Sequence, residues 1–266
     1  MARSSGRISR RERTLRIVVP ALVLGGIVFL WELGVRGFDI PHYILPAPSR
    51  IVATLVENFG SLATSWLFTI KITFGALLLA ALGGVLLATL FAMSRSVELA
   101  LFPVAIVLQV TPIVAIAPLI LIYVDSVTAA LLICAWIVAF FPILSNTVIG
   151  LRAADPNLRD LFTLYRASRW QRLRWLLVPS ALPYFIAGLK ISGGLALIGA
   201  VVAEFAAGAA GRETGLASRI LEASFRTDIP RMYAALLLVA LTGVAIFLLF
   251  NLLSKWLLGR WHASEQ

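Results

Sequence analysis

The chain has 266 residues, of which 60% are hydrophobic and only 14% are charged. Soluble domains are nearer half apolar and carry about 25% charged residues, so the composition excludes an ordinary soluble protein and indicates a membrane protein. The single cysteine, Cys134, excludes a disulfide within the chain and offers no metal cluster. A net charge of +10 would suggest nucleic acid for a soluble protein, but in a membrane protein arginines set the orientation, so we expect no nucleic-acid partner.

Six charge-poor runs predict an all-α, polytopic membrane protein with about six transmembrane helices, because a spanning helix needs roughly 20 residues. In chain order the runs are Ile17–Trp31, Ile72–Met93, Leu99–Val124, Ser126–Leu151, Tyr184–Ala210 (which contains Lys190 and Glu204) and Met232–Leu253. The predicted organisation is a basic tail (1–16), a first transmembrane helix (17–35), a five-helix core (60–258) that includes a polar loop (150–183), and a C-terminal tail (259–266).

The basic start followed by an apolar run also fits a secretory signal peptide. We find no small-x-small cleavage site after the run, and therefore prefer an uncleaved anchor. Most lysines and arginines lie in the N-terminal tail, the 150–183 loop and the C-terminal end. The positive-inside rule then predicts a multi-pass protein of the bacterial inner membrane, with both termini and this loop in the cytoplasm.

Small residues recur at every fourth position in two of the runs. They are Ala76, Ala80, Gly84, Ala88 and Ala92 in one run, and Gly188, Ser192, Ala196, Ala200 and Gly208, with Glu204 between the last two, in the other. Small residues at this spacing let helices approach closely in lipid. We therefore expect these two runs to be core helices.

Prolines interrupt the third and fourth runs, at Pro103, Pro112, Pro118 and Pro142. Proline removes a backbone hydrogen bond from a helix. A helix broken at membrane depth is tolerated only where protein or a water-filled cavity satisfies the freed groups. The prolines therefore suggest a solute pathway, and ordinary kinking is the alternative.

Glu204 is the acidic residue deepest inside a run, and a carboxylate there is costly and indicates function. Two interpretations are open. Glu204 lines or gates a solute path, or it lies at the outer interface and meets water. The polar residues Gln109, Thr111 and Asn146 are further candidates for the path, with interhelical hydrogen bonding as the alternative.

The 150–183 loop has the pattern of two short helices. Asp155 and Pro156 form a helix start, and Ser168 with Gln171 forms a capping box for a second helix that we expect to end at Pro179. The first helix has one apolar face at i, i+3, i+4 and i+7, made of Leu158, Leu161, Phe162 and Tyr165. Such a pair either lies flat on anionic headgroups or binds a soluble partner.

The loop also aligns with the pattern E-A-A, three residues, G, nine residues, I-x-L-P. The residues at these positions are Asp160-Leu161-Phe162, Arg166 and Leu176-Leu177-Val178-Pro179, of which only Pro179 is identical while Asp160, Leu176 and Val178 are chemically close. Further matching stretches are Phe140-Phe141-Pro142-Ile143-Leu144-Ser145-Asn146, Ala167-Ser168-Arg169-Trp170-Gln171, Ala181-Leu182-Pro183, Gly188-Leu189-Lys190-Ile191 and Val201-Val202-Ala203-Glu204. Over roughly residues 40–258, the chain resembles the permease subunits of binding-protein-dependent ABC importers, in the sulfonate, taurine and nitrate group.

This resemblance implies a type I ABC importer permease fold and a coupling helix in the loop. The coupling residues would be Leu158, Arg159, Asp160, Leu161, Phe162, Tyr165, Arg166 and Ala167. The implied partners are a cytoplasmic ATPase dimer, a second permease subunit, either identical or different, and a periplasmic substrate-binding protein. The implied cargo is a small solute such as a sulfonate, taurine or nitrate, or alternatively a thiamine pyrimidine precursor.

The sequence contains no G-x-x-x-x-G-K-[ST] phosphate loop. We therefore expect ATP-Mg to bind in the partner ATPase, and we expect no enzyme activity, cofactor, metal or catalytic residue in this chain. A stand-alone secondary transporter and an intramembrane lipid-modifying enzyme are the alternatives. The first would need paired repeats, and the second a constellation of acids, histidines or a nucleophile–base pair.

Arg166 stands where the signature has glycine. Glycine permits a tight turn, whereas arginine disfavours a positive φ. Three interpretations follow: the bend is made differently, Ala167 and Ser168 absorb it, or this subunit pairs with a different permease that has a standard loop.

Overall fold

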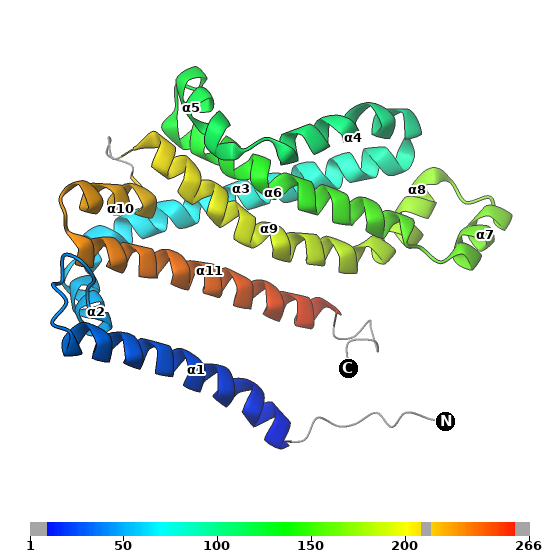
Figure 1. Ribbon diagram of the computed structural model, residues 1–266. Coiled ribbons are helices and arrows are strands. Elements are labelled where there is room, and N and C mark those ends of the chain that lie inside the picture. Colours follow the sequence, from blue (N-terminus) through cyan, green and yellow to red (C-terminus); the bar gives the residue numbers. More distant parts are fainter. Residues whose placement is uncertain (1–9, 209–213, 259–266) are drawn as a thin grey trace.

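The computed structural model describes residues 10–208 and 214–258, and every regular element in this part of the chain is helical (Figure 1), as predicted. The elements are α1 (Arg10–Gly37), α2 (Pro48–Glu57), α3 (Phe59–Met93), α4 (Arg95–Val110), α5 (Ile113–Tyr123), α6 (Val127–Arg152), α7 (Pro156–Leu164), α8 (Arg169–Arg172), a π-helical turn (Leu173–Leu177), α9 (Val178–Ala207), α10 (Leu216–Phe225) and α11 (Ile229–Leu258). Residues 1–9 of the predicted basic tail and the predicted tail 259–266 lie outside the described residues, and α1 begins within the remainder of the basic tail.

Five helical segments of the described chain are long and apolar enough to cross a bilayer. They are Val18–Gly37, Phe59–Met93, Val127–Arg152, Arg169–Ala207 and Ile229–Leu258. The pair α4 and α5 makes a sixth span if it is counted as one, although the two helices are bent by 102°. This agrees with the predicted six.

The bend lies at Pro112. Thr111, directly before it, has an extended backbone (φ −73°, ψ 124°), because a residue that precedes proline is disfavoured in the helical region. The other prolines of the third and fourth runs, Pro103, Pro118 and Pro142, lie inside helices. The third predicted run is therefore a broken span, and the fourth is one continuous helix.

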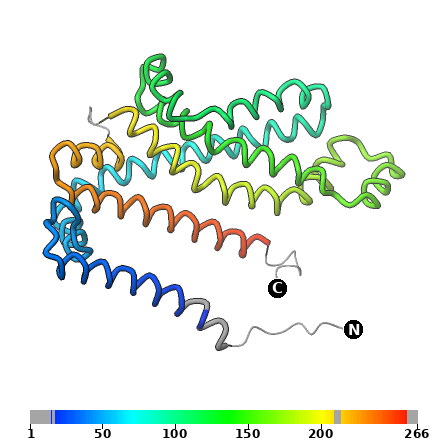
Figure 2. The backbone as a smooth tube through the Cα atoms, in the orientation of Figure 1, coloured from blue at the N-terminus to red at the C-terminus, as the bar shows by residue number. Residues whose placement is uncertain are grey.

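Helix α6 lies at the centre and packs most extensively against α9 and α3 (Figures 1 and 2). The small-residue stripes make these contacts possible. A Cβ added at Gly84 of α3 would meet Ile143 Cγ2 at 2.9 Å, and one added at Gly188 of α9 would meet the Pro142 carbonyl oxygen at 2.9 Å. The predicted close approach is confirmed, except at Ala92, which is exposed.

Helix α1 stands apart from this core. It contacts α2, and Trp31 packs against Tyr233 of α11 at 6.0 Å between ring centroids. Its apolar side chains are largely exposed, with Leu22 at 69% and Leu30 at 68%. No described part of the chain covers these side chains, and apolar surface of this extent fits contact with lipid or with another protein.

The short helices gather at the two ends of the bundle (Figure 1). Helices α7 and α8 project beyond α6 and α9, and we call this the loop end. Helices α2 and α10 lie at the opposite end, which we call the α10 end. Each end contains predicted functional residues.

Candidate functional site

At the loop end, α7 is a self-contained helix. The Asp155 carboxylate accepts a hydrogen bond from the Asn157 N–H at 2.7 Å, and Pro156 occupies the first helical position. This is the predicted helix start, and it satisfies one of the N–H groups that every helix leaves unpaired at its beginning.

Arg166 itself makes the turn after α7, with φ +52°. The Ala167 N–H donates to the Phe162 carbonyl at 2.9 Å and the Arg166 N–H to the Thr163 carbonyl at 3.0 Å. This pair of bonds is the Schellman motif, which normally has glycine at the left-handed position. Arginine therefore adopts the conformation that glycine would favour, and of the interpretations left open by the sequence, displacement of the bend onto Ala167 and Ser168 is wrong.

The capping box of α8 is present. The Ser168 N–H donates to Gln171 Oε1 at 2.7 Å, and the Gln171 N–H donates to Ser168 Oγ at 3.2 Å. The predicted helix end at Pro179 is wrong, because helical structure continues from Arg169 through the π-turn to Ala207. Pro179 directly follows the π-turn, in which the Val178 N–H donates to the Leu173 carbonyl, and this wider turn lets the helix pass the proline without ending.

The predicted apolar face of α7 is exposed. Leu161 is 44% exposed and Tyr165 is 79% exposed, and no residue of α7 is buried. Next to this face lies a pocket of about 350 Å³, lined by Leu161, Phe162, Tyr165, Ala167, Gln171 and Trp175. We call this surface the apolar loop face. Within the described part of the chain, Phe162 is half-buried and Leu161, Tyr165 and Trp175 stay exposed.

Arg159 differs from the other predicted coupling residues, because it points back into the protein. Its Nη2 donates to the carbonyls of Arg152 at 2.5 Å and Leu151 at 3.4 Å, at the C-terminus of α6. Arg159 therefore holds α7 against the end of a spanning helix. Leu158, Asp160 and Arg166 are exposed.

At the opposite end, the structure buries Glu204, which is 1% exposed. Its Oε1 accepts a hydrogen bond from the Thr69 hydroxyl at 2.8 Å, and its Oε2 accepts one from the Ala217 N–H at 2.9 Å. The Leu216 N–H donates to Thr69 Oγ1 at 2.9 Å. Glu204 of α9 and Thr69 of α3 thus satisfy two N–H groups at the start of α10, where negative charge is favoured.

Glycine at position 215 is required by this arrangement. A Cβ there would lie 2.0 Å from Glu204 Oε1. The carboxylate therefore packs directly on the backbone. Neither Thr69 nor Gly215 stands out in the sequence, because their importance comes only from their distance to Glu204. The interpretation of Glu204 as a carboxylate that meets water does not hold in this chain.

The other predicted path residues are not brought together with Glu204 by any recorded contact. Asn146 Nδ2 donates to the Pro142 carbonyl at 2.8 Å, and Thr111 Oγ1 donates to the Val107 carbonyl at 2.6 Å. Both bonds lie within one helix or its end. Gln109 is exposed on α4.

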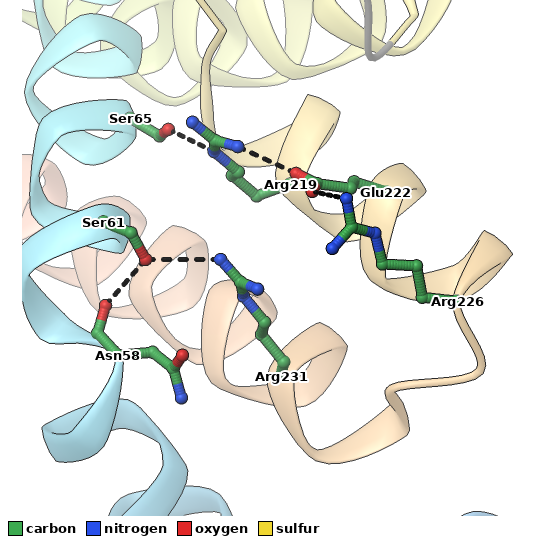
Figure 3. Close-up of polar contacts among 7 residues, drawn as sticks. All are labelled: Asn58, Ser61, Ser65, Arg219, Glu222, Arg226 and Arg231. Carbon is green, nitrogen blue, oxygen red and sulfur yellow. Dashed lines mark hydrogen bonds and ion pairs between the residues drawn. The ribbon is translucent and has the colours of Figure 1, made fainter.

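A polar network links α10 and the start of α11 to α3 (Figure 3). Arg219 Nε donates to Ser65 Oγ at 2.9 Å, and its Nη1 contacts Glu222 Oε2 at 2.8 Å; Arg226 contacts the other oxygen of Glu222 at 3.0 Å. The hydrogen bond from Arg219 is the main cause that lowers the pKa of Glu222. Arg231 donates to Ser61 at 3.3 Å.

With this geometry established, comparison with known proteins identifies the family. Residues 80–262 match the model of the binding-protein-dependent transport system inner membrane component. The chain belongs to this family. It is an ABC importer permease subunit, and the expected recognition is confirmed.

Individual relatives cover most of the chain. The riboflavin transport system permease protein RibX of Chloroflexus aurantiacus is 35% identical over 97% of this chain and 97% of its own length. The formylaminopyrimidine transport permease protein ThiX of Halalkalibacterium halodurans is 31% identical over 92% of this chain and 98% of its own length. The nitrate import permease protein NrtB of Synechococcus elongatus is 30% identical over 60% of this chain and 62% of its own length.

The fold has a solved counterpart in the crystal structure of an amino acid ABC transporter with histidines. The match has a TM-score of 0.61 at 18% identity, and covers 76% of this chain and 97% of that chain. At this identity the likeness shows the fold alone.

Proposed function

We propose that the chain forms the translocation pathway of an ATP-driven importer in a bacterial inner membrane, and that a separate cytoplasmic ATPase dimer binds and hydrolyses ATP-Mg. Both termini and the loop end then face the cytoplasm, and the α10 end faces a periplasmic substrate-binding protein. A second permease subunit, identical or different, completes the pathway and covers apolar surface such as that of α1. The apolar loop face carries this proposal.

The loop is built to contact another protein. Helix α7 is fixed at both ends, by Asp155 and by the turn at Arg166, and Arg159 ties it to α6. Its shape therefore does not depend on a partner, while Leu161 and Tyr165 remain exposed. An amphipathic helix with a free apolar face fits a hydrophobic groove, and we assign that groove to the ATPase.

The cargo we propose is a small anionic or strongly polar solute, such as a sulfonate, taurine or nitrate, with a thiamine pyrimidine precursor as the alternative. A pocket of about 490 Å³ near the α10 end supports an anion, because its lining includes Lys71, Arg219 and the hydroxyl residues Thr64, Ser65 and Thr214. Lys71 is exposed on a spanning helix. A lysine facing lipid there would be costly, so this surface fits a water-filled path or a protein contact better.

The test is to substitute Phe162 by Asp and to measure ATP hydrolysis and solute uptake by the reconstituted complex. A charge in an apolar groove costs a few kcal/mol, so we expect ATPase co-purification or binding-protein-stimulated turnover to fall at least about tenfold. Asn157→Asp is the matched control, because it introduces the same side chain on α7 at an exposed residue that does not line the pocket of the apolar loop face. Undiminished, ligand-stimulated turnover of Phe162→Asp in a normally assembled complex would refute the coupling role.

A further inference from the structure

A second pocket, of about 340 Å³, lies behind the loop, where α3 ends, α4 begins and α6 ends. Four arginines line it: Arg95, Arg152, Arg159 and Arg172. The one acidic residue of its lining is Glu98. We call it the arginine pocket. It shares no lining residue with the pocket beside the apolar loop face.

The charges in the arginine pocket do not balance. Glu98 accepts from Arg95 Nη1 at 2.9 Å and also pairs with Arg152. Arg159 and Arg172 have no carboxylate partner among the described residues, since Arg159 donates to backbone carbonyls and Arg172 Nη2 donates to Thr163 Oγ1 at 3.0 Å. The Nε atoms of both are buried and have no hydrogen-bond partner in the described chain.

Such an arrangement favours an anion. A guanidinium group removed from water without a counter-charge is costly, and a bound anion would compensate that cost. Several guanidinium groups around one cavity suit a phosphate group in particular, because arginine donates two parallel hydrogen bonds to its oxygens. The carboxylate of Glu98 already pairs with two of the four arginines, Arg95 and Arg152, and the other two are left for a phosphate group.

The position of the pocket indicates where the phosphate comes from. The apolar helices α3 and α6 end at Met93 and Arg152, beside the pocket, and its wall includes the apolar residues Phe91, Val148 and Leu177. An apolar wall that meets a basic rim at the end of a span is the arrangement expected at headgroup level. Basic pockets between transmembrane helices at the cytoplasmic side bind anionic headgroups.

We infer that the arginine pocket binds the phosphate group of an anionic phospholipid. Its placement in the inner leaflet rests on the orientation proposed above, whereas the binding site itself does not. The lipid would add the counter-charge that Arg159 and Arg172 lack, and would thereby hold the ends of α4 and α6 and the loop in one arrangement.

The experiment uses the full-length chain, purified in mild detergent with the subunits that accompany it. Phosphatidylglycerol, zwitterionic phosphatidylcholine and inorganic phosphate are added separately, and bound lipid is counted by native mass spectrometry while thermal stability is recorded. We expect phosphatidylglycerol to be retained and to raise the melting temperature. The double substitution Arg95→Gln and Arg172→Gln should weaken retention by about 25-fold, at about fivefold for each arginine near a headgroup.

Arg169→Gln is the matched control, because Arg169 is exposed, lies in the same loop and does not line the pocket. It should retain phosphatidylglycerol as the unmodified chain does. Equal retention of phosphatidylglycerol and phosphatidylcholine by the unmodified chain would overturn the inference, whether or not the double variant folds. Equal stabilisation by inorganic phosphate and by phosphatidylglycerol would overturn the lipid assignment. The assignment would also be overturned if the double variant lost the co-purifying ATPase but still retained the lipid.

Failure of this inference and failure of the proposed function are separable. Solute import and stimulated ATP hydrolysis by the unmodified complex test the function, and neither measurement requires the pocket to be occupied. A complex that imports solute but binds no phosphatidylglycerol would contradict only the lipid site.

Discussion

Helices α7 and α10 have nearly the same length, 9 and 10 residues, and each connects two spanning helices, yet they are held in opposite ways. Helix α10 buries Leu216, Ala217, Ser218 and Ala223, and its first N–H groups are bound by Glu204 and Thr69 of other helices. Helix α7 buries no residue and is capped by its neighbour in sequence, Asp155.

The difference shows what each helix can do. Because the first N–H groups of α10 are bound by α3 and α9, and its apolar side chains pack largely against α11, we expect it to move together with these helices. Helix α7 is held by local hydrogen bonds and by Arg159, so its apolar side can bind another molecule while the helix keeps its conformation. The apolar loop face is thus available to a partner, while the hydrogen bonds that hold α7 come from this chain.

The largest expected effect comes from the same substitution made in both helices. Leu216 is 0% exposed and Leu161 is 44% exposed. Leu216→Asp should cost at least about 3 kcal/mol, because it buries an unpaired charge, and should prevent recovery of folded protein in detergent. Leu161→Asp should change the melting temperature little while impairing ATPase coupling. Similar melting temperatures for the two variants would contradict the conclusion that α10 is held by burial in the bundle and α7 is not.

A smaller effect is expected at Gly215. Gly215→Ala places a methyl group on the Glu204 carboxylate, and overpacking of this kind costs about 1–3 kcal/mol. Gly60→Ala is the control, since a Cβ at Gly60 has nothing within 4 Å. Thermal unfolding of the purified chain should therefore distinguish the two variants. If Gly215→Ala melts like Gly60→Ala, Glu204 does not fasten α10.

The turn at Arg166 gives an effect of about 1 kcal/mol, the typical cost of a left-handed residue other than glycine. Arg166→Gly should leave the loop intact or protect it slightly, and Arg166→Val should expose it, because β-branched side chains tolerate positive φ worst. Hydrogen exchange of the α7 amides measures this. Faster exchange in the glycine variant than in the valine variant would show that the turn is not strained.

The smallest effect concerns Glu222, whose lowered pKa means that its ionised form stabilises the fold. The stabilisation is present above the usual value of 4.5 and is lost as the pH falls through the lower pKa of the folded state. Glu222→Gln should therefore reduce stability at pH 7 by at most about 1 kcal/mol, as for a partly exposed pair. The difference in melting temperature from the unmodified chain should shrink as the pH falls below 4.5 and should vanish once the pH lies below the lowered pKa of the folded state.

Local signals in the sequence predicted local structure well. The Asp155 cap, the capping box at Ser168 and Gln171, and the close contact at Gly188 depend on residues near in sequence or on helical spacing, and each is present. The helix end expected at Pro179 is wrong because the π-turn Leu173–Leu177 precedes the proline and carries the helix past it, and the sequence pattern does not show this turn.

Contacts between residues far apart in the chain could not be predicted from the sequence. Glu204 was singled out as a costly carboxylate, but its partners Thr69 and Ala217 lie 135 and 13 residues away in sequence, and no periodicity connects them. Arg159 was grouped with the coupling residues because it lies beside them, whereas the return of its side chain to α6 depends on how the loop folds back. The apolar side of α7 could be predicted because it follows from helical spacing, whereas its exposure depends on what packs against it in the folded chain.

The unbroken helical path from Arg169 to Ala207 has a mechanical consequence. Its 39 residues measure about 58 Å, so that a tilt of about 10° around the midpoint would displace each tip by about 5 Å. One tip carries the capping box and the other carries Glu204, which grips α10. A rigid helix of this length would transmit a displacement of one end to the other end. The π-turn at Leu173–Leu177 is the one place along it where the helical geometry changes.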